Sequence, residues 1–63
     1  METIKEVLIR RDGISADEAD ELIAEARAQM ELYIAENDYF AAEDICNEFF
    51  GLEPDYLMEL MPA

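Results

Sequence analysis

The sequence predicts an all-α protein, a compact bundle of three to four helices. Apolar residues recur at the i, i+3 and i+4 spacing of helices along most of the chain, and helix-capping residues, Gly and Pro separate these runs. With 63 residues and 52% hydrophobic content, the chain should fold around one core as a single helical domain covering residues 1–63. The expected helices cover residues 3–11, 15–36, 38–50 and 54–61.

The first two helices begin with similar signals. Thr3 and Glu6 have the spacing of a capping box, and so do Ser15 and Glu18. Gly13 should end the first helix, after two arginines that suit a helix C-terminus. The second helix should present one wide apolar face made of Ala19, Leu22, Ile23, Ala26, Met30, Tyr33 and Ile34.

The third and fourth helices follow a break at Asn37-Asp38. Asp38 can cap the third helix, and Gly51 followed by an apolar residue fits a Schellman-type ending. Pro54 suits the first position of a short fourth helix. The inward residues should be Ala42, Ile45, Cys46, Phe49 and Phe50 on the third helix, and Leu57, Leu60 and Met61 on the fourth.

Residues 23–56 resemble one tetratricopeptide repeat. The matching positions are Tyr33, Tyr39, Ala42, Leu52 and Pro54, whereas Ala26, Met30 and Gly51 depart from the pattern. The resemblance implies a central tetratricopeptide-like helix hairpin. It does not imply the peptide-binding groove of that family, because the groove needs several stacked repeats.

The chain also resembles small acidic proteins of bacteriophages and mobile elements. This resemblance rests on Arg-Asp-Gly at residues 11–13, Glu-Ala-Asp-Glu-Leu-Ile at 18–23 and Phe-Gly-Leu-Glu-Pro-Asp-Tyr-Leu at 50–57. It implies an accessory role directed at a host protein, and it implies no catalytic residues.

The charge balance favours a basic partner. Seventeen Asp and Glu against four Lys and Arg give a formal net charge of -13, which repels nucleic acids and anionic membranes. We therefore expect no direct nucleic-acid binding and no membrane binding. The alternative is that acidity only keeps a small domain soluble. The absence of an apolar signal region and of a membrane-length segment, together with a single cysteine, predicts a cytoplasmic protein.

The sequence also argues against catalysis. It has no His to act as a base, Ser15 is expected to serve as a cap, and Cys46 lies on an apolar helix face. The acidic pairs Glu21 with Glu25 and Glu43 with Glu48 are best explained as solvated helix faces. We predict that the protein is not an enzyme.

Metal binding is also not expected. The loop around Gly13 superficially resembles an EF-hand, but aligning Gly13 with the invariant glycine puts Leu8 and Arg10 at the first acidic positions and Ala19 at the bidentate one. Any divalent ion held between neighbouring carboxylates would be bound nonspecifically. We predict no metal and no other cofactor.

Two features point to surfaces for a partner. Leu32 shares a second stripe of the long helix with three alanines, at positions 24, 28 and 35, and its neighbour is either the first helix of the same chain, which we favour, or a second copy in a homodimer. Phe40 projects away from the apolar face of the third helix and is either an exposed anchor or folded over the Asn37-Asp38 corner. Met30 and Tyr33 are expected in the core, whereas Met58 and Met61 fit either core or surface.

The leading hypothesis is an acidic interaction protein that binds and inhibits a basic host protein, such as a nucleic-acid-handling enzyme, by imitating nucleic-acid phosphates with rows of carboxylates. The alternative is a structural or adaptor module that self-associates or clasps a partner helix. The candidate partner-binding residues are Phe40, Leu32, Glu21, Glu25, Glu43, Asp44 and Glu48.

Overall fold

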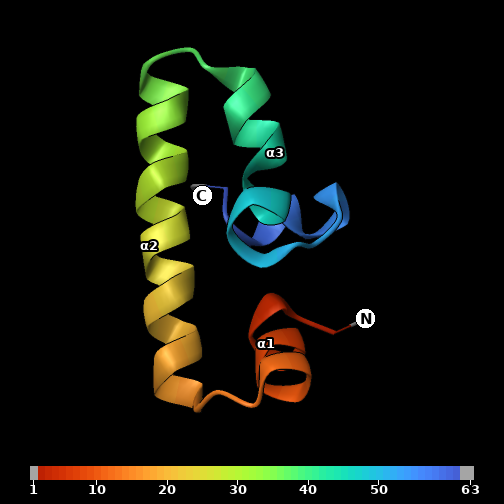
Figure 1. Ribbon diagram of the computed structural model, residues 1–63. Coiled ribbons are helices and arrows are strands. Elements are labelled where there is room, and N and C mark those ends of the chain that lie inside the picture. Colours follow the sequence, from red (N-terminus) through yellow and green to blue (C-terminus); the bar gives the residue numbers. More distant parts are fainter. Residues whose placement is uncertain (1, 62–63) are drawn as a thin grey trace.

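The computed structural model describes residues 2–61, which form three α-helices and one short 3₁₀-helix (Figure 1). The helices are α1 (Ile4–Asp12), α2 (Ala16–Ala35) and α3 (Tyr39–Phe50), and the 3₁₀-helix is η1 (Pro54–Glu59). No strand occurs within residues 2–61, so the predicted all-α class is confirmed. The fourth helix differs from the α-helix expected over 54–61. With three residues per turn, a 3₁₀-helix places Leu57 and Leu60 on the same side, and Leu60 is buried.

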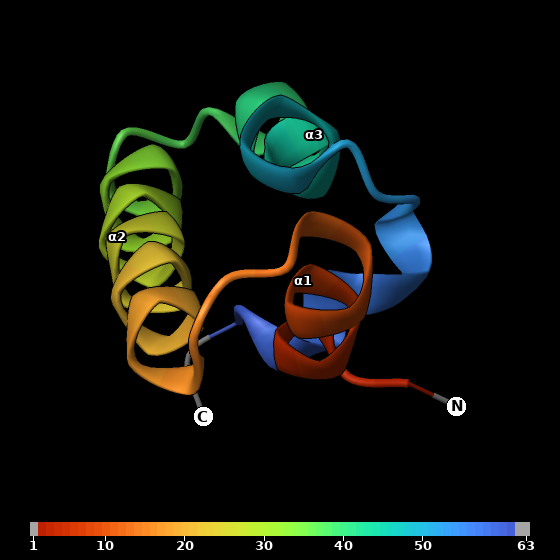
Figure 2. The same cartoon turned by 60° about the horizontal axis from the view of Figure 1, so that its bottom comes forward.

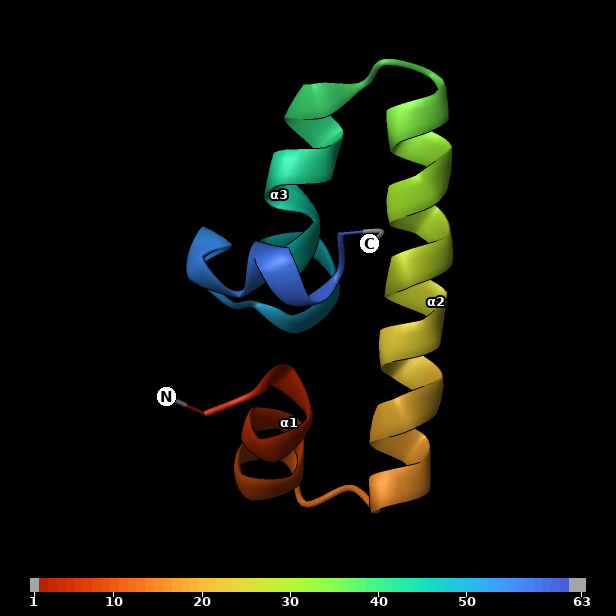
Figure 3. The same ribbon diagram turned by 180° about the vertical axis from the view of Figure 1, so that it is seen from behind.

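Helix α2 is the longest element, and the other three lie on one side of it. Its 20 residues span about 30 Å at 1.5 Å per residue, close to the 34 Å length of the molecule. Helix α3 runs back antiparallel beside the C-terminal half of α2, whereas α1 lies beside the N-terminal half, and η1 lies between α3 and α1 (Figures 1 and 3). The view in Figure 2 also leaves the far side of α2 without a neighbour.

The helix ends follow the local sequence signals. Thr3 Oγ1 accepts a hydrogen bond from the Glu6 N–H at 3.2 Å, and the Glu6 carboxylate accepts one from the Thr3 N–H at 3.0 Å, which confirms the capping box. At the start of α2, the Glu18 N–H donates to Ser15 Oγ at 3.1 Å, which is one half of the box predicted there. Gly13 and Gly51 both have a φ of 66°, so each ends its helix in the left-handed conformation that glycine adopts without strain.

The corner between α2 and α3 is built by Asn37 and Asp38. Asn37 adopts a φ of 59°, its N–H donates to Ile34 O at 3.0 Å, and the Asp38 N–H donates to Tyr33 O at 2.8 Å. This is the Schellman arrangement with Asn in the left-handed position. Asp38 then accepts a hydrogen bond from the Ala41 N–H at 3.3 Å and caps α3. The two residues end one helix and begin the next, as predicted.

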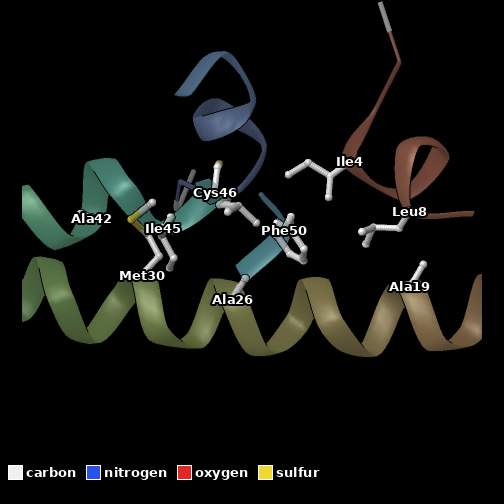
Figure 4. Close-up of a cluster of buried hydrophobic side chains, with 10 residues drawn as sticks. Ile4, Leu8, Ala19, Ala26, Met30, Ala42, Ile45, Cys46 and Phe50 are labelled. Atoms are coloured by element: carbon white, nitrogen blue, oxygen red, sulfur yellow. The ribbon is translucent and has the colours of Figure 1, made fainter. Parts of the chain in front are cut away.

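The core lies between α2 and the three shorter elements. Small residues of α2 face larger partners, with Leu8 above Ala19 and Phe50 above Ala26 (Figure 4). Met30 is buried as predicted, but Leu22 is 39% exposed, because it lies about 80° around the helix from Met30, at the edge of the apolar face. The buried cluster consists of Ile4, Leu8, Ala19, Ala26, Met30, Ala42, Ile45, Cys46, Phe50 and Leu60.

Glu59 joins three elements that are far apart in the sequence. Its carboxylate accepts hydrogen bonds from the Ile4 N–H, at 3.2 Å and 3.3 Å to its two oxygens, and so caps the N-terminus of α1. Its carbonyl oxygen accepts hydrogen bonds from Nε and Nη2 of Arg27 on α2, at 3.3 Å and 3.2 Å. Glu59 therefore holds η1 against both α1 and α2.

Replacing Glu59 with alanine should lower the free energy of unfolding by about 1 kcal/mol, because the Ile4 N–H loses its capping acceptor. Urea denaturation followed by circular dichroism measures this loss. Glu53→Ala is the matched control, since it removes the same charge from an exposed residue that makes no side-chain capping bond. Equal stability losses in the two variants would show that the Glu59 contact contributes nothing.

Replacing Met30 with alanine should cost about 2–5 kcal/mol, because it leaves a cavity in the centre of the core. Met58→Ala, at a side chain that is 83% exposed, should change the unfolding free energy by less than about 0.5 kcal/mol. If Met30→Ala leaves no folded protein to measure, Met30→Leu should still fold with a loss below about 1.5 kcal/mol. A Met30→Ala protein as stable as Met58→Ala would contradict the placement of Met30.

Candidate partner-binding surface

The predicted partner-binding residues fall on two separate surfaces. Met30 marks the side of α2 that packs against α3. Glu21, Glu25 and Leu32 lie about 180–220° around the helix from Met30, so they point away from α3. All three are exposed, Leu32 by 55%. They form the outer face of α2, separate from the predicted residues of α3.

The stripe of small residues on α2 has no neighbour within residues 2–61. Ala24, Ala28, Ala35 and Leu32 are all exposed, so the expected packing of the first helix against them is wrong. Helix α1 instead packs on the core side of α2, where Leu8 lies over Ala19, because both side chains are removed from water there within the main apolar cluster. The alternative neighbour, a second copy of the chain, stays a prediction.

Phe40 is an exposed aromatic residue at the start of α3. Its side chain is 89% exposed, so the interpretation in which it folds over the corner is wrong. Tyr39 takes that place, because its hydroxyl donates a hydrogen bond to Asn37 Oδ1 at 3.2 Å. Phe40, Glu43 and Asp44 line a shallow hollow together with Pro54 of η1. We call these four residues the Phe40 surface.

Glu48 has a different role from the other predicted carboxylates. It accepts a hydrogen bond from the Tyr33 hydroxyl, at 3.4 Å and 3.3 Å to its two oxygens, across the α2–α3 interface. Burial raises the pKa of Tyr33, and the negative charge of Glu48 raises this pKa further. Glu48 therefore holds the two helices together at the edge of the core.

An apolar groove, which the sequence did not predict, lies between the C-terminal half of α2, the first turns of α3 and the end of η1. Its volume is about 430 Å³. Sequence periodicity assigned most of its lining residues to a closed core, whereas the structure leaves Ile34 and Leu57 partly exposed and Met61 52% exposed. We call this the hairpin groove, and its lining residues are Met30, Ile34, Tyr39, Ala42, Glu43, Leu57 and Met61.

All four basic side chains make contacts within the molecule. Three of them form ion pairs, and the guanidinium of Arg27 binds the Glu59 carbonyl. The hydrogen bond from Arg10 holds the pKa of Glu2 below its ordinary value. The ion pairs are Lys5 with Asp20 at 3.0 Å, Arg10 with Glu2 at 2.7 Å and Arg11 with Asp12 at 2.9 Å.

The negative charge is distributed unevenly along the molecule. No Lys or Arg follows Arg27 in the sequence. The α2–α3 corner, the Phe40 surface and the lining of the hairpin groove therefore contain acidic side chains and no Lys or Arg. We call these three regions together the hairpin end. The acidic residues after Arg27 are Glu31, Glu36, Asp38, Glu43, Asp44, Glu48, Glu53, Asp55 and Glu59.

The side chains with nucleophilic or ligating atoms have structural positions. Cys46 is fully buried in α3, and its side chain points toward η1 (Figure 4). Ser15 is engaged in capping α2. Within residues 2–61, no three acidic or cysteine side chains are grouped so that they could hold a metal ion. The absence of a cofactor and of catalysis stays a prediction.

Comparison of the chain with protein-family models, with curated proteins and with solved structures finds no match. Both resemblances drawn from the sequence therefore stay predictions. No helix within residues 2–61 is long and apolar enough to cross a membrane.

Stability should fall at alkaline pH because of Cys46. Burial raises the pKa of its thiol above the ordinary value of 9.0, and the charge of Glu59 acts in the same direction. The folded state keeps this proton longer than the unfolded state, so the contribution is complete below pH 9 and is lost as the pH rises through the folded-state pKa. Unfolding free energies measured from pH 7 to pH 10 should fall more steeply for the wild type than for Cys46→Ala. Parallel curves would contradict the raised pKa.

Proposed function

We propose that this protein is a non-enzymatic, cytoplasmic interaction protein that binds and inhibits a basic protein through its acidic hairpin end. The observation that carries the proposal is the use of every basic side chain within the fold. Because each of these cations is engaged by a group of the fold and none follows Arg27 in the sequence, a partner meets carboxylates and no compensating Lys or Arg at the hairpin end. A field of one sign attracts a basic partner and repels acidic ones.

The Phe40 surface supplies a second element of recognition. Aromatic side chains are enriched among the residues that contribute most to binding energy, and Phe40 is the most exposed large apolar residue among residues 2–61. Glu43 and Asp44 lie beside it in the same hollow. In this proposal charge attracts the partner, and Phe40 fixes the contact.

The partner class follows from the geometry of the charges. Duplex DNA carries about one negative charge per 1.7 Å of its axis, and carboxylates spaced along α-helices also present closely spaced negative charge. A basic site that normally holds nucleic acid would therefore accept this surface. The resemblance to small acidic phage proteins supports a nucleic-acid-handling host protein as the partner.

We also propose that the α2–α3 pair is a tetratricopeptide-like hairpin, with the small Ala42 buried where α3 meets α2.

The proposal predicts that a basic protein is captured from a nuclease-treated bacterial lysate at low salt and released at high salt. Mass spectrometry identifies the protein, and its affinity is then measured between about 50 mM and 500 mM NaCl. The affinity should fall steeply with salt, because the attraction between the charges is screened. An affinity that does not change with the NaCl concentration, or a captured partner that is not basic, would count against electrostatic recognition.

Charge reversal at two positions of α3 distinguishes the effect of the Phe40 surface on binding from the effect of the net charge of the protein. The double variant Glu43→Lys with Asp44→Lys should weaken binding of the captured partner at least tenfold. The matched control, Glu21→Lys with Glu25→Lys, makes the same change in net charge on the outer face of α2 and should bind much more tightly than the first variant. Equal losses would show that the partner responds only to net charge.

A further inference from the structure

The hairpin groove is an accessible apolar site at the acidic end of the molecule. Its floor is formed by buried residues, among them Met30 and Ala42, and its rim by Tyr39 and Met61, which are 57% and 52% exposed. The volume of about 430 Å³ falls within the range of about 300–1,000 Å³ that is typical of ligand pockets. This space suits a few apolar side chains.

The charge around the groove restricts what can occupy it. Glu43 belongs both to the groove and to the Phe40 surface, so the groove opens directly onto the acidic hairpin end. A second copy of the chain would bring another net charge of -13 against this end, and its own hairpin end contains no Lys or Arg to compensate. A basic partner has the complementary charge.

The groove lies between helical elements. Its lining residues come from α2, α3 and η1 and from Met61, which follows η1. An amphipathic helix binds such a groove by inserting apolar residues at i, i+3 or i+4, and i+7. The unbranched side chains of Met30 and Met61 adapt to inserted groups of different shape.

We propose that the hairpin groove binds an amphipathic helix of a basic partner, with the apolar face of that helix in the groove and its Lys and Arg side chains against the surrounding carboxylates. This inference rests on the proposed function for the sign of the partner's charge. It adds the site and the secondary structure of the bound segment. Tyr39 and Met61 are its principal apolar contacts at the rim, and Glu43 is the nearest acidic contact.

A panel of synthetic peptides tests the proposal. Each peptide carries Leu at i, i+3, i+4 and i+7 with Lys and Arg elsewhere, and is paired with a scrambled peptide of identical composition that lacks an apolar face. Fluorescence anisotropy with the full-length protein should show amphipathic peptides binding at least tenfold more tightly than their scrambled partners. A panel in which no amphipathic peptide exceeds its scrambled partner would overturn the proposal.

Matched substitutions locate the contact. Tyr39→Ala and Met61→Ala should each weaken binding of the amphipathic peptide at least fivefold, whereas Met58→Ala should leave it within twofold of the wild type. Met58 is a suitable control, because it is a methionine like Met61, is 83% exposed and does not line the groove. Circular dichroism checks that each variant is folded. Equal effects of groove and control variants would overturn the assignment.

Three further outcomes would overturn this inference or separate it from the proposed function. If peptides with Glu in place of Lys and Arg bind the groove equally well, a basic partner is excluded and so is the charge element of this inference. If scrambled basic peptides bind as tightly as amphipathic ones and are released by salt, the acidic surface acts without the groove. Sedimentation equilibrium showing a dimer that Tyr39→Ala dissociates would assign the groove to a second copy and overturn the proposal.

Discussion

The packing of three short elements against the apolar face of α2 is the constraint on which this structure depends. A chain of 63 residues with a single cysteine and no histidine has no internal disulfide and no set of Cys and His ligands for zinc, so apolar burial must supply most of its cohesion. Ala19, Ala26 and Met30 provide the surface on which α1 and α3 rest. A change on this face is transmitted to every other element, whereas the outer face of α2 takes no part in the core.

Cohesion and charge act against each other in this molecule. A net charge of -13 on so small a domain destabilises the compact state through self-repulsion. The few cations are placed on α1 and near the middle of α2, where they contact carboxylates or a backbone carbonyl. The α2–α3 corner contains no cation that would compensate its carboxylates. This uncompensated charge is the feature on which the proposed recognition of a basic partner rests.

Local signals in the sequence predicted the helices well, because capping and periodicity act over a few residues. Thr3, Asp38 and Gly51 each ended or began a helix where their chemistry required. Contacts between distant segments were not predictable in this way. No local pattern around Glu59 indicates that its carboxylate caps α1. The position of Leu22 at the edge of the apolar face depends on where α1 and α3 pack.

The candidate site was predicted only in part, for the same reason. The exposure of its carboxylates followed from the helical pattern. Their division between the outer face of α2 and the Phe40 surface on α3 depends on how the helices pack. The exposed position of Phe40 could be distinguished from a position over the Asn37-Asp38 corner only in the structure, where Tyr39 occupies that corner. The hairpin groove was missed, because periodicity identifies the side of a helix that faces inward and does not show whether neighbouring elements close over it.

The contact between Glu59 and Ile4 has a consequence for the order of events during synthesis. The two residues are separated by 55 positions, so the hydrogen bond that Glu59 makes at the N-terminus of α1 cannot form until the chain has been synthesised through η1 and has left the ribosome. Helix α1, with 9 residues, is shorter than the length of about 12–15 at which isolated helices become even marginally stable in water. Helix α1 is therefore expected to acquire its final structure after α2 and α3, although it precedes both of them in the sequence.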